Sequence, residues 1–536
     1  MLKEQHMPID NWAIDGLNVD VEEKELLRLP LSQPKNFGHP LASLASFVDG
    51  CSGPAERALG TGRSFGAQWL RNAYHDMSTA DVFAGTGGLD ASIVFEMDRP
   101  ENIGDAFQET LNIFKGNYIN RMSMSDLFAL ATVMAVGGCS DGKVIVPLKG
   151  GRVDAAGPGP SGVPEPKQDL QTHTASFAKQ EFDTFEMIAL VACGHTVGGV
   201  HGVDFPEIVP NPAPTDGIRI SNSLADNFDN IVAKEYIANV SQNPLEFGQN
   251  EPTRSDFRIF HADGGGMISQ MATSNDFFLD TCNTMFERMI NTVPSNVKLT
   301  DIKPLDVKPR KLSVTVNDDG TLSIVDDLIK DNGTRILVHL SSRSADPLLV
   351  AEATTSRGQR GGCAYRNCGL SFTYYTFDST IPAEQGISSF TVEIEDSQTG
   401  KSTSHENGGA GFPLPDDILL VLALSRQSAV TIDGISQMRL NLTAAILNAE
   451  SFTDVPLIVP QPSNKSAPIS PWTQEEVPMR PLGKVDGTNF TLYAGIWQSS
   501  SPTSSAASTH PFDIVAVGPN KTVSSLLNSW DDVPRE

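Results

Sequence analysis

The spacing of apolar residues changes near Pro304, and this change constrains the fold more than any other feature of the 536-residue chain. Before it, apolar residues recur at helical spacing, as in segments 123–136 and 275–293. After it, they alternate with polar residues, as in 311–327. A chain of this length exceeds one hydrophobic core, so the pattern predicts a multidomain protein. We expect a mainly α domain followed by a β-sandwich-like region.

The same pattern divides the chain into four expected parts. Residues 1–40 lack clean periodicity and are expected to form an N-terminal arm, followed by a helical domain at 41–303. Residues 304–426 are expected to form a β-sandwich-like domain, and 427–536 a further β-rich region that contains a Ser-rich loop. The pattern leaves open whether everything after 304 is one elaborated sandwich or two domains.

The charge of the chain excludes several classes of partner. A formal net charge of −26 and a pI near 4.7 argue against nucleic acid and anionic membrane surfaces, which need basic patches. No apolar run approaches the roughly 18 residues that a membrane span needs, and the run at 418–424 has the length of a buried strand. We therefore expect no nucleic-acid partner and no membrane span.

Other features are typical of a secreted protein, although the first twelve residues contain no apolar segment of a signal peptide. We expect that the signal peptide is not part of this chain. Asn-x-Ser/Thr sequons, which permit glycosylation, occur at Asn239, Asn332, Asn441, Asn464, Asn489 and Asn520.

The six cysteines also favour an oxidising compartment. Four precede residue 300 and two follow it, which suits disulfides formed within each module. Cys363 and Cys368 can close a short bridge. For Cys193, a small apolar residue in a buried helix is an alternative.

One short stretch, Phe65–Met77, carries the first candidate chemistry. In a helix, Arg71 and His75 are four residues apart and share a face. An imidazole beside a guanidinium can move a proton while the cation stabilises charge that develops on oxygen. Taken alone, the pair also fits an ordinary surface or core contact.

The second candidate lies 120 residues downstream. Segment 181–201 predicts a helix with a capping box, Asp183 and Glu186, and a glycine-rich end. Its apolar run brings His195 to the end of a buried helix. A neutral imidazole there suits a metal or a haem iron, or a hydrogen bond to a carbonyl group.

Together these stretches belong to an ordered series of motifs that resembles the haem peroxidases shared by plants, fungi and bacteria. The resemblance runs from about Pro40 to Pro294 and is strongest to the secreted fungal members. The motifs are RNAYHDM (71–77), GTGGLDASIVFEMDRPEN (85–102), GGRVDA (150–155), VPEP (163–166), CGHTVGG (193–199), FDN (228–230) and HADGG (261–265).

The resemblance implies haem b as cofactor, with His195 as the iron ligand. It implies that Asp263, in HADGG, accepts the hydrogen of the second ring nitrogen of His195. In the segment after His195 the chain supplies Phe205 as a haem neighbour and has no tryptophan, so the radical tryptophan of cytochrome c peroxidase is not expected.

On the opposite haem face, the resemblance gives His75 the proton transfer of peroxide cleavage and Arg71 the stabilisation of charge. Asn102 would hold the tautomer of His75, and Glu96 matches the supporting carboxylate of the family. Tyr74 departs from the family, which has phenylalanine or tryptophan there. It can be a wall residue, a hydrogen-bond donor to water or an oxidisable phenol.

The resemblance also implies one or two calcium ions. A distal site would use oxygen ligands from Asp76, Gly88, Asp90 and Ser92. Thr196 and Asp229 fall near a proximal cation site.

The reducing substrate is inferred from residues that are missing. Lignin-degrading relatives that oxidise manganese carry carboxylates where this chain has Gln68 and Ser64, and the surface tryptophan of others is replaced by Leu190. We therefore expect hydrogen peroxide and a small phenolic or aromatic donor as substrates of a secreted monomer.

Two alternatives remain. An intracellular-type peroxide scavenger is disfavoured by the sequons and the paired cysteines. A non-enzymatic extracellular binding protein on a peroxidase scaffold would predict loss of Arg71, His75 or His195, and all three are present.

Overall fold

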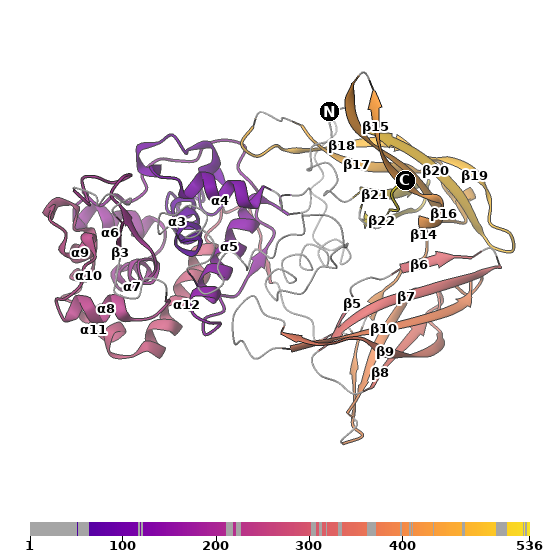
Figure 1. Cartoon of the computed structure of the whole chain (residues 1–536), viewed down its shortest axis with the longest axis horizontal. Helices are drawn as coiled ribbons and strands as arrows, with labels where there is room; N and C mark the ends of the chain where they lie inside the picture. Colours follow the sequence, from indigo (N-terminus) through magenta and orange to yellow (C-terminus); the bar gives the residue numbers. More distant parts are fainter. Residues whose placement is uncertain are drawn as a thin grey trace. The chain divides into compact units, whose positions relative to one another are not determined.

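A computed structural model shows that the chain contains two compact units, and the change from one to the other falls between Lys303 and Pro304. The first is helical and the second consists of antiparallel sheets (Figure 1). The chain is therefore a multidomain protein with a mainly α part followed by a β-rich part. The expected arm at 1–40 and the expected Cys363–Cys368 bridge lie outside the described residues. These are 51, 64–115, 118, 122–210, 218–220, 227–301, 307–309, 313–317, 319–330, 335–361, 371–396, 399–406, 409, 411–432, 434–463, 467–499, 512–528, 530 and 533–536.

The helical unit is built around α5, which is buried along its whole length. None of its described helices is both long and apolar enough to cross a membrane. Its α-helices are α3 (Phe65–Met77), α4 (Ala106–Phe114), α5 (Met124–Cys139), α6 (Leu170–Lys179), α7 (Thr184–Gly194), α8 (Ile231–Ile237), α9 (Pro244–Phe247), α10 (Ser255–Phe260), α11 (Gly266–Thr273) and α12 (Asn275–Asn291). Between them lie the 3₁₀ turns η2 (Ser92–Phe95), η3 (Pro100–Asn102) and η4 (Glu251–Thr253), and the short strands β1 (Lys149–Gly150), β2 (Gly199–His201), β3 (Ile218–Ile220) and β4 (Thr300–Asp301).

Side-chain caps explain where several helices begin. The carboxylate of Asp183 accepts the backbone N–H of Glu186, and the Glu186 carboxylate accepts the N–H of Asp183, so the capping box predicted for α7 is confirmed. At the start of α5 only half of a capping box forms. The Ser123 hydroxyl accepts the N–H of Asp126 at 3.0 Å, but the Asp126 carboxylate accepts hydrogen bonds from Arg152 instead.

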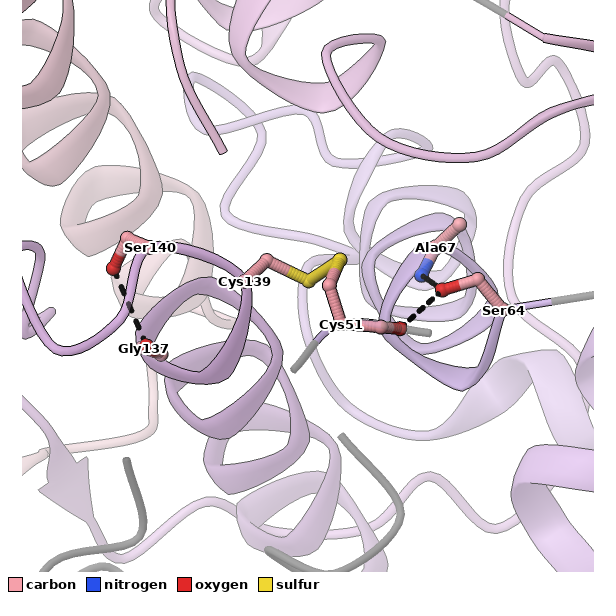
Figure 2. Close-up of a disulfide and its surroundings, with 6 residues drawn as sticks. All are labelled: Cys51, Ser64, Ala67, Gly137, Cys139 and Ser140. Atoms are coloured by element: carbon pink, nitrogen blue, oxygen red, sulfur yellow. Dashed lines mark hydrogen bonds between the residues drawn. A yellow bond between two sulfur atoms is a disulfide. The ribbon is translucent and has the colours of Figure 1, made fainter. Parts of the chain in front are cut away.

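Two disulfides fasten the helical unit, so the four cysteines before residue 300 pair within it as predicted. Figure 2 shows Cys51 joined to Cys139 at the end of α5, and Cys193 of α7 is joined to Cys282 of α12. A Cβ atom at Gly66 of α3 would lie 3.0 Å from the Cys139 sulfur, so a glycine lets α3 approach the first bridge.

The β unit begins with two layers that face each other across one core. Strand β9 (Pro347–Gly361) is shared, since its first half pairs with β8 (Arg335–Ser341) and its second half with β10 (Ser371–Pro382). The first layer adds β11 (Ser389–Glu395), β12 (Ser402–His405) and β13 (Phe412–Pro413). The second adds β5 (Val307–Pro309), β6 (Ser313–Val316) and β7 (Thr321–Lys330), and the paired strands β6 and β7 fall in or overlap the alternating segment 311–327. Alternate residues of both layers form one hydrophobic cluster, as in a sandwich.

Two further sheets complete the β unit. One contains β14 (Ile418–Leu420), β15 (Arg426–Ile432), β16 (Ile435–Leu447), β19 (Arg480–Lys484) and β20 (Phe490–Gln498). The other contains β17 (Pro456–Pro462), β18 (Trp472–Pro478), β21 (Phe512–Val517) and β22 (Thr522–Asn528). Residues of β16 contribute to the core between these two sheets and also to the core of the first sandwich.

The boundary expected at 426/427 falls after β14 and just inside β15, between its first and second residues. Both strands pair with β16, so they belong to one sheet. The four-part division of the chain therefore stays a proposal.

Candidate active site

Helix α3 positions the first group of candidate residues. Ser64 caps the helix, which runs without interruption through Arg71 and His75. His75 and Arg71 lie one turn apart, as the sequence spacing predicts. The rest of the helix packs inward through residues such as Trp69 and Ala73, both fully buried.

Two hydrogen bonds fix the orientation of His75. The Nδ1 atom of His75 lies 2.9 Å from the Oδ1 atom of Asn102, and the Asn102 Nδ2 group donates to the Glu96 carbonyl oxygen at 3.0 Å. Because the second bond identifies the amide nitrogen, Oδ1 is the acceptor and Nδ1 of His75 carries the hydrogen. The Nε2 atom of His75 is then the basic nitrogen.

Glu96 contributes here through its backbone, whereas the resemblance suggested a carboxylate contact. Its carboxylate accepts the N–H of Gly159 at 2.6 Å and pairs with Arg99 at 2.9 Å. It therefore braces the loop that presents Asn102.

The surroundings of His75 favour the neutral imidazole. Burial, the positive charge of Arg71 and the nearby His195 lower the pKa of His75 to about 3, against a smaller opposing effect of Asn102. His75 is consequently a neutral base at ordinary pH.

Arg71 lies against two aromatic rings. Its guanidinium carbon is 4.6 Å from the ring centroid of Phe107 and 5.3 Å from that of Phe205, and its Nη2 donates to the Ile103 carbonyl at 2.8 Å. The structure thus places Phe205 beside Arg71. A guanidinium carries five N–H donors in a fixed fork, a geometry that suits stabilisation of an anion.

Tyr74 points into the protein. Its ring centroid is 6.1 Å from that of Phe177, its hydroxyl is buried, and burial raises its pKa despite the nearby Gln180 amide. The phenol therefore stays protonated. This packing favours the wall role over the other two considered for Tyr74.

Helix α7 delivers the second histidine. His195 is the C-cap residue, and its backbone N–H donates to Val191 at 2.9 Å. The bridge from Cys193 to α12 ties down the last turn. Immediately afterwards the chain turns at Gly198, where a Cβ atom would lie 2.5 Å from the Ala67 side chain of α3. The segment after His195 thus packs directly on the helix that carries His75.

The residue that holds His195 is Asp256, so the prediction of Asp263 was wrong. The Nδ1 atom of His195 lies 2.9 Å from Oδ2 of Asp256, in the first turn of α10. Asp263 instead accepts the backbone N–H groups of Gly265, Gly266 and Met267 at 2.7–3.0 Å, at the start of α11. Asp263 is a turn residue before glycines, and those local amides occupy its carboxylate.

His195 and Asp256 stabilise each other's charge. Burial alone would lower the pKa of His195, but the Asp256 carboxylate and, more weakly, Glu246 outweigh it, and the net pKa is raised. Burial alone would raise the pKa of Asp256, but His195, Asn243 and Ser255 outweigh it and lower that pKa. A negative partner on Nδ1 makes Nε2 a strong electron donor to a proton or to a metal.

The expected calcium ligands of the distal side lie close together but already hydrogen-bond to the protein. Asp76 accepts the N–H groups of Asp90, Ala91 and Ile93 at 2.7–2.9 Å. Asp90 accepts the N–H of its neighbour Ser92 at 3.1 Å. Burial and the Asp90 carboxylate raise the pKa of Asp76 well above its usual value. Gly88 is buried just before Asp90.

Thr196 and Asp229, expected near a second cation, are also joined. The Thr196 hydroxyl donates to the Asp229 carbonyl at 2.6 Å, and the Asp229 carboxylate accepts the N–H of Ile231 at 2.9 Å. Across the described parts of the chain, no group of three or more His, Cys, Asp or Glu side chains is arranged to hold a metal ion.

The two histidines fit a haem iron site. No hydrogen bond joins either Nε2 atom to a described residue. The His195 side chain is 42% accessible, so a ligand can reach it. One accessible imidazole that donates strongly from Nε2 is the ligand chemistry that haem iron takes.

Sequence reasoning missed Asp256 and the two residues behind it, Asn243 and Glu246. The Asn243 amide donates to Asp256 at 3.0 Å and to Glu246 at 3.2 Å. The sequence does signal that a helix starts here, because Asn243 precedes a proline at the first helical position. Nothing in that signal indicates contact with Asp256.

Comparison with known proteins shows which family the chain resembles. The family model described as "Peroxidase" matches residues 53–328. A "WSC domain-containing protein" of Arthroderma benhamiae is 35% identical over 374 residues, which cover 67% of this chain and 50% of that protein. A "Putative L-ascorbate peroxidase 6" of Arabidopsis thaliana is 33% identical over 152 residues, covering 26% of this chain and 43% of the relative. A "Catalase-peroxidase" of Rhizobium johnstonii is 24% identical over 252 residues, which cover 37% of this chain and 34% of that protein.

The chain spans half or less of the length of each of these relatives. The family match begins shortly before α3 and includes both histidines, Arg71, Asn102 and Asp256. This chain belongs to the peroxidase family.

Proposed function

We propose that the chain is a secreted haem peroxidase that reduces hydrogen peroxide and oxidises small phenolic or aromatic donors, acting as a monomer. The pairing of His75 and His195 carries the proposal. Each imidazole is held at Nδ1 by its own partner, and each Nε2 is free of described partners. The partners differ in charge, since Asn102 is neutral and Asp256 is anionic, so the two imidazoles are prepared for different tasks.

His195 would hold haem b through Nε2. Haem supplies an iron that binds peroxide and takes up two oxidising equivalents from it. Asp256 keeps the His195 ring oriented and electron-rich through the bond to Nδ1, and this favours cleavage of the peroxide bond. The disulfide at Cys193 and the cap at Asp183 keep the ligand at a fixed position.

His75 would act as the proton carrier on the other side. Its neutral Nε2 would take a proton from one oxygen of hydrogen peroxide and return it to the other, which would leave as water. Arg71 stabilises negative charge on the departing oxygen while the bond breaks. Asn102 keeps the Nδ1 hydrogen in place, so that Nε2 stays the acceptor.

The donor is proposed from the chemistry near α3. Ser64 caps the helix, and Gln68 is buried and hydrogen-bonded to Glu109, so neither offers a carboxylate to manganese. Small phenols need only access to the haem edge. Small phenols are therefore the reducing substrates that we propose for this chain.

Secretion and glycosylation are supported by the two disulfides and by the sequons. Asn239, Asn489 and Asn520 are exposed in loops or turns, whereas Asn441 is half-buried within β16. Asn332 and Asn464 lie outside the described residues. Exposed asparagines in turns are accessible to glycosylation, so we expect glycans at Asn239, Asn489 and Asn520.

Calcium stays a prediction for the segment around Asp76. Its carboxylate and that of Asp90 are buried near each other, and burial raises the pKa of both. A divalent cation would offset this repulsion. The Thr196–Asp229 pair offers weaker grounds, since the contact that joins the two residues uses the Asp229 carbonyl group and not its carboxylate.

A spectrophotometric assay tests the proposal. The full chain, loaded with haem, is expected to oxidise a phenolic dye only when hydrogen peroxide is present, and the haem-free chain is expected to be inactive. A chain that binds haem stoichiometrically and oxidises no donor would overturn the enzymatic proposal in favour of a binding role.

A further inference from the structure

The buried amide of Asn243 has a fixed orientation. Asn243 is 1% exposed and precedes α9, where its Oδ1 atom accepts the backbone N–H of Leu245 at 3.0 Å. A backbone N–H can only donate, so this contact identifies the amide oxygen. The Nδ2 group must therefore point to the other side and act as the donor.

Both hydrogens of that Nδ2 group are used on carboxyl groups. One is directed to Oδ2 of Asp256 at 3.0 Å and the other to Oε1 of Glu246 at 3.2 Å. The same Oδ2 atom of Asp256 accepts His195 Nδ1 at 2.9 Å, while Ser255 donates to the other carboxylate oxygen at 3.1 Å. Asn243 and His195 thus share one acceptor atom.

Sharing has an electronic consequence. A donor to a carboxylate oxygen stabilises its negative charge and reduces its pull on any other hydrogen. The Asn243 amide therefore limits how far the Nδ1 hydrogen of His195 moves towards Asp256. Without it, His195 would take on more of the character of an imidazolate.

A second carboxyl group, that of Glu246, also accepts a hydrogen bond from the Asn243 amide. Glu246 is fully buried, and burial raises its pKa to about 8, so it is mostly neutral near pH 7. The Asn243 amide lies between it and Asp256 and bonds to both. Asp256 therefore carries most of the negative charge beside His195 among these groups.

We propose that Asn243 is a positioning residue, which sets how strongly Asp256 draws the Nδ1 hydrogen of His195 and thereby how strongly His195 donates electrons to a bound haem iron. The inference rests on the proposed function only in assuming that His195 ligates haem. It adds a residue that the motifs did not indicate.

The test is the ferric/ferrous midpoint potential of the haem-loaded full chain, measured by spectroelectrochemistry. Asn243→Ser is the informative variant, because serine retains an N-cap acceptor for Leu245 but is too short to reach Asp256. Stronger donation by His195 stabilises ferric iron. The ferric/ferrous equilibrium is expected to shift about tenfold towards ferric iron. For a one-electron couple this lowers the midpoint potential by about 59 mV.

Asn230→Ser is the matched control. Asn230 is a buried asparagine in the same unit, and its Nδ2 donates to the carbonyl oxygens of Met271 and Ala272 at 2.9 and 3.1 Å. This variant loses buried hydrogen bonds of similar number without touching Asp256. Its potential is expected to equal that of the wild type.

An unchanged potential in Asn243→Ser would overturn the inference. If that variant does not retain haem, Ser255→Ala removes the donor on the other oxygen of Asp256 and is expected to lower the potential by a smaller amount. An unchanged potential in that variant would also overturn the inference. A wild-type chain that takes up no haem would instead overturn the proposed function.

Discussion

The Nδ1 atom of His195 lies 2.9 Å from the Oδ2 atom of Asp256, although the two residues are 61 positions apart. The contact joins the end of α7 to the first turn of α10. It leaves the Nε2 atom of His195 as the strong donor of the site. The acceptor lies seven residues before the aspartate that the motif series suggested.

Asp256→Asn and Asp263→Asn are predicted to have different effects. The first removes the anion from His195, so haem affinity or peroxide cleavage should fall by roughly 10–100-fold. Asp263→Asn keeps an acceptor oxygen for the backbone amides at the start of α11. It should change haem affinity and the rate of peroxide cleavage by no more than about twofold. Haem titration and stopped-flow mixing with peroxide measure both quantities. The opposite ranking would restore Asp263 as the partner.

Local spacing predicted how two of the distal candidates lie, and the motif resemblance gave them a role and added Asn102. Arg71 and His75 share a helix face because four residues make about one turn, and the structure also brings Asn102 to His75. The helix start at Asp183 was equally visible as a short-range pattern. The switch to strands after Pro304 was visible because the period of apolar residues changes from helical to alternating.

The proximal partner could not be predicted in this way. Asp256 and Asp263 lie seven residues apart, and only the packing of α10 buries the first, which is 0% exposed. Asp263 has three glycines after it, which marks a turn, and the motif resemblance outweighed that local signal. The contact between the Asn243 amide and Asp256 depends on the packing of α9 against α10. No local sequence pattern predicts that packing.

The rate of peroxide cleavage should not change with pH near 6.5, the usual pKa of a histidine. Burial and Arg71 lower the pKa of His75 to about 3, so its basic form persists down to that pH. The unfolded chain binds this proton near pH 6.5, so the free energy of unfolding should fall as pH drops from there towards 3. Stopped-flow rates and urea unfolding across this range test both statements. A rate midpoint near 6.5 would show that His75 is exposed to solvent.

Removing either disulfide should cost similar stability but affect haem differently. The bridges close loops of 89 and 88 residues, so each double Cys→Ser variant should lose roughly 4 kcal/mol. Only loss of Cys193–Cys282 frees the turn that carries His195. Haem dissociation should therefore accelerate in that variant and stay near the wild-type rate when Cys51–Cys139 is lost. Equal acceleration in both would point to general loosening of the unit.

Manganese should not be a saturable substrate. Two or three converging carboxylates are needed to bind Mn²⁺. The positions that supply two of them in the lignin-degrading relatives hold Gln68 and Ser64 here, and the Gln68 side chain bonds to Glu109. The net charge of −26 attracts cations only diffusely and in a salt-sensitive way. Formation of chelated Mn³⁺ should rise linearly with Mn²⁺ and fall with salt. Saturation at micromolar Mn²⁺ would reveal an oriented site elsewhere.

The central claim is that His75 carries the proton during peroxide cleavage. Stopped-flow absorption of the haem-loaded chain, mixed with one equivalent of hydrogen peroxide, tests it most directly. His75→Leu should retain the haem spectrum but react roughly 10²–10⁴-fold more slowly than the wild type, since a positioned base contributes that much. Tyr74→Phe, on the same helix, is the matched control and should react at the wild-type rate. A spectral change at wild-type rate in His75→Leu would contradict the account.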